Sequence, residues 1–356
     1  MTATPRIEIN LKKIHHNASE LVKRFSRQGI SITGVCKATL GSPEVANTLL
    51  RAGVSSLGDS HIENIESMRH TGVRSEMVLI RSPMLSQVSR VVASVDVSLN
   101  TEISVIRALS RAASSAGRSH GVILMVELGD RREGLMPVEL FKAVGQTLGL
   151  PNIRLQGIGT NLACRSGIAP DARNMAELSA LAQSIETTFD YPLETISGGN
   201  SANLDWGLSG IETGRVNNLR LGEAILLGRE PLHRQPIRGL YTDAFTLVAE
   251  VIESNVKPSR PVGTTALAAY GAVDQVADHG LVMQAILAIG RQDINPDGLM
   301  ACEGISVMGA SSDHLIVWAD KRQLAVGVEV PFQLDYGALV SAMTSPFVAK
   351  VFHNGS

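Results

Sequence analysis

The sequence predicts an α/β protein with two domains, a (β/α)8 TIM barrel over residues 1–235 and a β-rich C-terminal domain over residues 236–356. Eight short apolar segments alternate with helical segments over about 200 residues, which is the number and length that a parallel barrel needs. The alternation stops after Gly228, where prolines interrupt the chain and the later segments favour strands. A length of 356 residues with 44% hydrophobic content also suits two domains.

Hydrophobic periodicity and helix start signals define the elements of the predicted barrel. Ser42-Pro43-Glu44 is typical of a capped helix start, and Ser60-His61-Ile62-Glu63 has the pattern of a capping box. The predicted strands are Ile30–Cys36, Val54–Leu57, Met77–Ile80, Val95–Leu99, Val122–Glu127, Arg154–Gly159, Leu193–Ser197 and Asn218–Leu221. The predicted helices are Leu11–Phe25, Ser42–Gly53, one that begins at Ser60, Pro83–Val92, Thr101–Ala116, Pro137–Gly149, Asp171–Thr188 and Asn203–Leu208.

The C-terminal domain is predicted to be built from strands, with no helices alternating between them. A further strand-like segment, Ile7–Leu11, could join this domain, so that residues 1–11 would leave the barrel. The predicted strands of the domain are Phe245–Ile252, Leu281–Ile289, Ile305–Met308, His314–Trp318 and Leu324–Val328.

Composition narrows the class of ligand and the compartment. Lys and Arg number 32 against 34 Asp and Glu, a net charge of −2, so neither nucleic acid nor an anionic membrane is indicated as a partner, and a small molecule is favoured. Cys36, Cys164 and Cys302 lie far apart, which fits reduced, buried thiols in a cytoplasmic protein better than a disulfide framework and predicts no metal site. The sequence shows no signal peptide and no membrane span.

Lys37 follows the first predicted barrel strand and has no acidic neighbour in the sequence. Burial at a strand end would lower the pKa of its ammonium and make the amine available as a nucleophile. The alternative is a lysine whose side chain extends to solvent. The residues at the other strand ends decide between the two.

Polar residues follow every predicted strand at its carboxyl end, where a (β/α)8 barrel carries its chemistry. After the seventh strand, Ser197-Gly198-Gly199-Asn200-Ser201 is either a plain turn or a phosphate site built on backbone N–H groups. A phosphate site opposite a strand-end lysine suggests pyridoxal 5'-phosphate (PLP). The polar strand-end residues are Lys37, Asp59, Arg81, Asn100, Arg131, Arg132, Asn161, Ser197, Arg220 and Glu223.

Four segments in this order, Val35–Ala38, Glu127–Gly134, Asn200-Ser201 and Leu219–Gly222, resemble the motifs of fold-type III PLP-dependent amino-acid racemases of the alanine and ornithine racemase group. The resemblance covers most of the chain. It implies that Lys37 binds PLP as a Schiff base and that Arg132 contacts its phenolic oxygen. It implies that Asn200 and Ser201 hold the phosphate together with the backbone at Gly222 and Glu223, and that Arg220 faces the pyridine nitrogen.

An arginine in that place would donate a hydrogen bond and leave the pyridine nitrogen unprotonated, which weakens the cofactor as an electron sink and limits side reactions. Arg220 could instead be a solvated charge, but its neighbours Leu219 and Leu221 argue against this.

Racemisation needs a proton donor or acceptor on each face of the substrate. Lys37 can serve one face. Ala269-Tyr270-Gly271 resembles the family motif whose tyrosine, from the partner subunit, serves the other, so a homodimer with shared active sites is implied. Tyr336 resembles a tyrosine that reaches the phosphate, and Tyr270 could otherwise be a packing residue.

Three positions depart from the alanine racemase pattern: Gly41 stands in place of a tyrosine, Asn161 in place of a histidine and Met125 in place of a lysine. The C-terminal segments Gly290–Asp293 and Ser311–His314 resemble the ornithine racemase branch instead. By that resemblance, Asn161, Ser311 and Ser312 would bind substrate, and Asp293 or Asp313 would pair with a side-chain amine. Asp313 and His314 could equally cap a turn.

The sequence therefore predicts a PLP-dependent racemase that acts by a two-base mechanism, on ornithine or another basic amino acid. Two alternatives stay open: a D-amino-acid lyase or dehydratase of the same fold, and a PLP-binding protein without turnover. The single-domain carriers of this fold lack a β-rich domain, and the roughly 120 residues after the barrel argue against that alternative. His61 is interpreted as a polar residue at a helix start and not as a catalyst.

Overall fold

The computed structural model describes residues 4–264, 266–271, 277–320 and 324–354. The chain divides into two compact units, one formed by Lys12–Thr242 and the other by Met1–Leu11 together with Asp243–Ser356. Residues from both ends of the chain therefore build the second unit, and its long segment begins at Asp243.

Eight parallel strands close into a barrel in the unit Lys12–Thr242, every residue of which is described. The barrel closes where β9 pairs with β2, with Ser31 opposite Asn218 and Gly34 opposite Leu221. The predicted barrel is confirmed, and each strand limit lies within two residues of the predicted one. The strands are β2 (Ser31–Val35), β3 (Ser56–Asp59), β4 (Met77–Leu79), β5 (Val97–Asn100), β6 (His120–Met125), β7 (Ile153–Gly159), β8 (Thr195–Ser197) and β9 (Asn218–Leu221).

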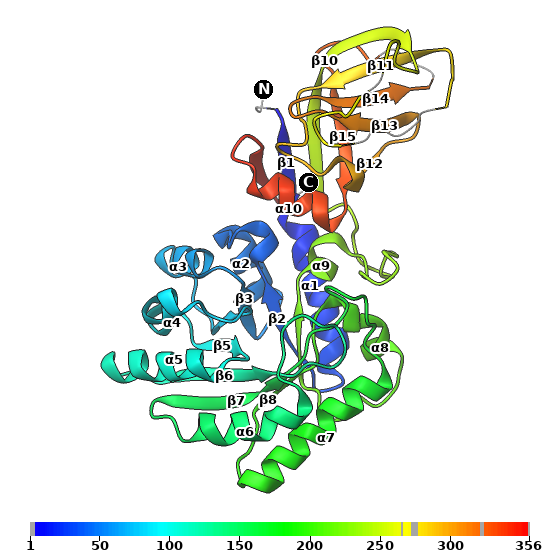
Figure 1. The fold of residues 1–356 in the computed structure, drawn as a ribbon. Coiled ribbons are helices and arrows are strands. Elements are labelled where there is room, and N and C mark those ends of the chain that lie inside the picture. Colours follow the sequence, from blue (N-terminus) through cyan, green and yellow to red (C-terminus); the bar gives the residue numbers. More distant parts are fainter. Residues whose placement is uncertain (1–3, 265, 272–276, 321–323, 355–356) are drawn as a thin grey trace. The chain divides into compact units, whose positions relative to one another are not determined.

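Helices lie outside the strands, as Figure 1 shows for α2 to α7. Their apolar faces contribute Ile106, Leu140 and Leu178 to one buried cluster that also contains Val122 of β6. The α-helices of this unit are α1 (Leu11–Ser26), α2 (Pro43–Arg51), α3 (Ile62–His70), α4 (Val88–Ser94), α5 (Ile103–Ser115), α6 (Pro137–Leu148), α7 (Ala172–Phe189), α8 (Leu204–Leu208) and α9 (Glu223–Leu227). The 3-10 turns are η1 (Lys37–Thr39), η2 (Leu85–Gln87) and η3 (Ser201–Asn203).

Two helix starts test the predicted caps. Ser42 caps α2 as predicted, since its Oγ accepts the Val45 N–H at 3.3 Å. The capping box at Ser60 is wrong, because β3 runs on to Asp59 and α3 begins one residue later, after His61. The Asp59 carboxylate takes over the role of the cap: its Oδ1 accepts the His61 N–H at 2.9 Å and the Asn64 Nδ2–H at 3.0 Å.

The second unit is β-rich, as predicted, with eight strands in one sheet among its described residues. β1 is part of this sheet, antiparallel to β10 and parallel to β16. The strands are β1 (Arg6–Asn10), β10 (Phe245–Pro258), β11 (Leu281–Leu287), β12 (Leu299–Ala301), β13 (Ile305–Ala310), β14 (Leu315–Ala319), β15 (Glu329–Leu334) and β16 (Ala349–His353), and one 3-10 turn, η4 (Pro296–Gly298), precedes β12.

The predicted strand Leu324–Val328 is wrong. These residues form a turn with Gly327 at φ +88°, and β15 begins only at Glu329. The helix α10 (Tyr336–Thr344) lies between β15 and β16, which departs from the expectation that no helix alternates with the strands. It begins where Asp335 Oδ1 accepts the Ala338 N–H at 2.8 Å. Within the described residues, no helix combines the length and apolar character that crossing a bilayer requires.

Candidate active site

Lys37 lies directly beyond the carboxyl end of β2, as the first residue of the turn η1. The preceding Cys36 is fully buried, and its N–H donates to the Gly58 carbonyl of β3 at 2.8 Å, which anchors the turn to the barrel wall. Burial raises the pKa of the Cys36 thiol, and the nearby Asp59 raises it further, so this cysteine stays a neutral packing residue. Lys37 itself is half-buried.

The turn after Lys37 explains the glycine at position 41. Leu40 and Gly41 both adopt left-handed backbone conformations, with φ of 53° and 64°. A Cβ atom on Gly41 would lie 2.8 Å from the Asn64 Cβ and 2.9 Å from the Asn64 carbonyl oxygen. The helix α3 therefore occupies the space that a tyrosine would need at this position.

Arg220 is the most deeply buried cation of the barrel mouth, 5% exposed at the end of β9. Its guanidinium donates to Ser197 Oγ, to the Thr160 carbonyl at 2.7 Å and to Asn161 Oδ1 at 3.5 Å. Burial lowers the pKa of Arg220 to about 10, and Arg132 adds to the lowering while Glu133 opposes it. Among the described residues, no carboxylate forms an ion pair with it. The alternative of a solvated charge is thereby excluded for Arg220.

Asn161 and Asn200 meet beside Arg220. The Asn200 Oδ1 accepts the Ala202 N–H at 2.7 Å, so its Nδ2 must donate, and it does so to Asn161 Oδ1 at 3.1 Å and to the Leu162 carbonyl at 2.9 Å. The Asn161 Nδ2 is buried and finds no partner in the described part of the chain. An unpartnered buried donor is costly, so this amide is suited to an acceptor on a ligand.

The turn after β8 packs against the start of α9. Ser201 is buried, and its Oγ accepts the Ala224 N–H at 3.1 Å. Gly199 has φ +143°, and a Cβ there would lie 2.2 Å from Asn203 Oδ1, so only glycine fits. Gly222 caps α9 directly before Glu223. The structure thus brings the two glycine-containing segments of the predicted phosphate site together.

Arg132 lies in the loop after β6, where its guanidinium forms an ion pair with Glu133. Glu127 Oε1 holds this loop by accepting the N–H groups of Gly129 at 2.6 Å and Arg131 at 3.0 Å. Arg131 has a φ of 57°, unusual for a residue with a side chain. The loop keeps Arg132 near enough to Arg220 to affect its pKa.

In the second unit, Tyr270 lies in a cluster with Ser312 and Arg291. Its hydroxyl and the Ser312 Oγ are 3.4 Å apart, and the Arg291 guanidinium carbon lies 5.5 Å from the centre of its ring. The Arg291 N–H donates to the Ser311 carbonyl at 2.8 Å, which joins the two segments that carry the cluster. Tyr270 is 56% exposed, so one side of its ring faces away from this unit.

Sequence reasoning missed Arg291, because a contact between a ring and a cation 21 residues apart leaves no periodic signal. Asp293 already has a hydrogen-bond partner inside this unit, because its Oδ1 accepts a hydrogen bond from Ser345 Oγ at 2.7 Å. Asp313 is exposed, and Tyr336 is the first residue of α10. His61 is the cap residue of α3, with Ser60 Oγ at 3.1 Å from its Nδ1.

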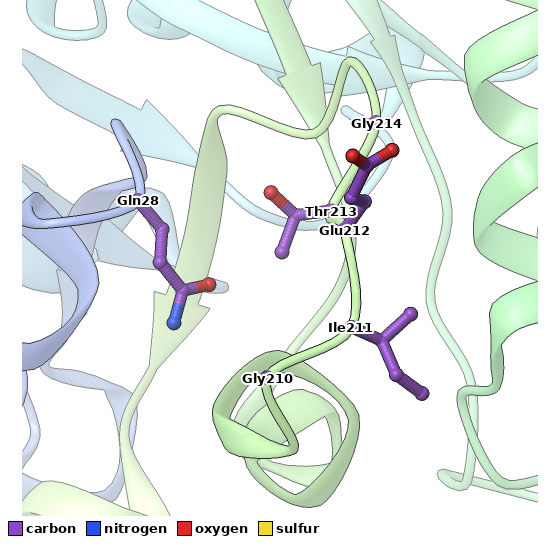
Figure 2. Close-up of a pocket in the computed structure, with 6 residues that line it drawn as sticks. All are labelled: Gln28, Gly210, Ile211, Glu212, Thr213 and Gly214. Carbon is purple, nitrogen blue, oxygen red and sulfur yellow. The ribbon is translucent and has the colours of Figure 1, made fainter.

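One surface hollow of about 430 Å³ contains none of the predicted site residues. It is lined by Gln28, which follows α1, and by the loop Gly210–Gly214, which precedes β9 (Figure 2). These segments enter the strands at their amino ends, opposite to the end that carries Lys37 and Arg220. The candidate site is therefore the carboxyl end of the barrel.

Comparison with known proteins agrees with this geometry. The model of the alanine racemase N-terminal domain matches residues 9–230. Over its full length, the chain is 36% identical to a lysine racemase from Thermotoga maritima (98% of each chain) and 34% identical to an ornithine racemase from Acetoanaerobium sticklandii (97% of this chain, 99% of the relative).

Solved structures share the fold at lower identity. The alanine racemase from Bartonella henselae with covalently bound pyridoxal phosphate is 17% identical, with a TM-score of 0.75 over 99% of this chain and 100% of that one. The D-threonine aldolase from Filomicrobium marinum is 15% identical, with a TM-score of 0.73 over 96% and 89%. A barrel that matches the family model and two full-length relatives above 30% identity establish that the chain belongs to the alanine racemase family.

Proposed function

We propose that this protein is a PLP-dependent racemase that interconverts the L- and D-enantiomers of a basic amino acid, lysine or ornithine. The full-length similarity to racemases of these two amino acids carries the proposal. The site supports it, because a strand-end lysine, a buried arginine and a glycine-containing turn meet at one end of the barrel.

The residues present fit PLP. Arg220 is a buried donor without an acidic partner in the described chain, and Asn161 Nδ2 is a buried donor that lacks an acceptor. Lys37 would carry the cofactor, Arg220 would donate to its ring nitrogen and Arg132 to its phenolic oxygen. Its phosphate would be held by Asn200, Ser201, Tyr336 and the backbone at Gly222 and Glu223.

When bound, PLP supplies an electron sink that stabilises negative charge at the α-carbon of the substrate. Lys37 accepts or returns the α-proton on one face, and the tyrosine at position 270 does so on the opposite face. Ser311 and Ser312 would receive the substrate carboxylate, and Asp293 or Asp313 would pair with the side-chain amine. Arg220 would donate a hydrogen bond to the ring nitrogen and keep it unprotonated, which would limit charge delocalisation and hence side reactions.

We propose further that the enzyme is a cytoplasmic homodimer with shared sites, in which Tyr270 serves the barrel of the partner. The exposed ring of Tyr270 supports this, as do the large exposed side chains Val262, Leu267 and Leu281, at 92%, 81% and 73%. All three cysteines are free, which suits a reducing compartment. Cys36 is buried as predicted, whereas Cys164 and Cys302 are exposed, so the prediction of buried thiols is wrong for these two.

The test is to incubate the purified protein with PLP and with L-lysine, L-ornithine or L-alanine, and to follow both enantiomers by chiral chromatography. Each basic amino acid should reach an equal mixture from either enantiomer, with alanine slower. A shared fold with a D-threonine aldolase gives the second candidate, a lyase, which would consume the substrate irreversibly. If neither enantiomer is converted into a mixture of both, the proposed racemase activity is refuted.

The Lys37→Ala variant tests the lysine. It should lose activity and the visible absorption of the lysine-bound cofactor together, because no amine remains to bond to PLP. If borohydride reduction still fixes PLP covalently to this variant, another lysine carries the cofactor.

A further inference from the structure

A chain of buried hydrogen bonds runs from Arg220 across the barrel interior. The Arg220 Nη1 donates to Ser197 Oγ on β8, which lies 2.6 Å from Asn218 Oδ1 on β9. The Asn218 Nδ2 lies 3.1 Å from Thr33 Oγ1 on β2, and this oxygen is 2.8 Å from Ser56 Oγ on β3. All five side chains are at least 92% buried, so water does not compete for these bonds.

The directions of the first three bonds in this chain follow from Arg220. A guanidinium can only donate, so the Ser197 oxygen accepts and its single hydrogen goes to Asn218 Oδ1. That fixes the amide, whose Nδ2 must then donate to Thr33 Oγ1. Between Thr33 and Ser56, either hydroxyl can be the donor. The acceptor atoms of Ser197 and Asn218 therefore point back toward Arg220.

Aligned dipoles of this kind favour a positive charge on Arg220 without neutralising it. A carboxylate would also stabilise the cation, but it would hold the guanidinium in an ion pair and compete with any ligand acceptor. Among the described residues, the partners of Arg220 are a hydroxyl, a carbonyl and an amide oxygen. These hydrogen bonds thus stabilise the positive charge of Arg220 and leave its guanidinium available to a ligand.

We propose that Ser197 and Asn218 are positioning residues, which hold Arg220 charged and oriented as a hydrogen-bond donor toward the ring nitrogen of PLP. The inference rests on the proposed function, since it requires PLP in this barrel. Neither residue is expected to touch the substrate, so both act only through Arg220.

The test compares two ligands of the apoprotein, PLP and an analogue in which carbon replaces the ring nitrogen. Both carry the aldehyde and the phosphate, but only PLP offers an acceptor to Arg220. The wild-type protein should bind PLP more tightly than the analogue, by about tenfold or more for a hydrogen bond from a charged donor. Ser197→Ala should lose most of this preference, because Arg220 is no longer held in place.

Ser98→Ala is the matched control. Ser98 is also a fully buried serine of a barrel strand. It shares one side-chain hydrogen bond with His120 at 2.8 Å and accepts another from Asn100 at 2.9 Å, and neither partner belongs to the Arg220 chain. It should keep the wild-type preference, even if its thermal midpoint falls as far as that of Ser197→Ala. A loss of stability alone would lower the affinity for both ligands equally.

Asn218→Asp is the second variant, and it keeps the test decisive if Ser197→Ala does not fold. Its carboxylate would draw Arg220 into an ion pair, so the preference for PLP should again fall. An unchanged preference in the folded variants would overturn the inference while the racemase stands. Failure of the wild-type protein to bind PLP at all would overturn the proposed function and the inference together.

Discussion

His120, at the start of β6, should make the stability of the barrel depend on pH. The side chain is 1% exposed, and its Nε2 lies 2.8 Å from Ser98 Oγ. Burial lowers the pKa of His120 to about 4, and the nearby Asp96 only partly opposes the lowering. The folded protein therefore binds a proton at this imidazole far less readily than the unfolded chain, whose histidines have a pKa of about 6.5.

The size of the effect follows from the two pKa values. A depressed pKa contributes stability that is present above about pH 6.5 and lost as the pH falls toward 4. With an unfolded pKa of about 6.5, the free energy of unfolding should fall by about 2 kcal/mol by pH 5 and by about 3 kcal/mol by pH 4. This is a large fraction of the stability of a typical domain.

The assay is urea unfolding of the wild-type protein and of His120→Gln, followed between pH 7.5 and 4.5. Carboxylates and other histidines titrate in both proteins, so the difference between the two curves isolates His120. Substituting His70, an exposed residue near the Glu66 carbonyl, controls for the loss of an imidazole. If the free energy of unfolding of His120→Gln falls with pH as steeply as that of the wild type, the buried neutral histidine is refuted.

Three further predictions concern the site. Gly41→Ala should lower the free energy of unfolding by about 2–4 kcal/mol, because it combines left-handed backbone strain with steric overlap. Gly29 has φ +71° and open space around it, so Gly29→Ala should show only the strain of about 1–2 kcal/mol. Equal losses of stability in the two variants, measured by thermal unfolding, would exclude the overlap. Tyr270→Phe should slow solvent deuterium entry into one enantiomer of the substrate by about 100-fold or more, and not into the other; unchanged entry from both would exclude it as a base. Asp293→Asn or Asp313→Asn should raise KM for lysine about tenfold or more and leave KM for alanine unchanged, and equal effects on both substrates would exclude a role in side-chain recognition.

The barrel was predictable from the sequence because its strands are short, apolar and separated by strong helix signals. β6 is buried at every position, and after His120 and Gly121 it continues as an apolar run from Val122 to Met125. The second unit was harder to predict. An apolar run ending in Val328 predicted a strand where the chain turns at Gly327, and α10 follows Asp335 without a preceding helical pattern.

The candidate site was also predictable from the sequence only in part. Lys37, Asn161 and Arg220 lie at strand ends, and since the strands of a barrel share one direction, their order along the chain already brings them to one rim. The contacts that define their chemistry are long-range: Asn161 meets Asn200 across 39 residues. Which of their donors and acceptors are satisfied depends on angles and distances that no motif encodes.

The pairing of β1 with β16 has a consequence for synthesis on the ribosome. The first strand of the second unit is made before the whole barrel, yet its parallel neighbour, Ala349–His353, is made almost last. Residues 6–10 therefore cannot pair with this neighbour until nearly the entire chain has emerged from the ribosome, and one edge of the strand stays unpaired until then. A fragment that begins after residue 11 would lack the strand that pairs with both β10 and β16. We therefore expect the C-terminal segment alone to be insoluble. We also expect a shortened N-terminus to damage the folding of the second unit as much as a shortened C-terminus.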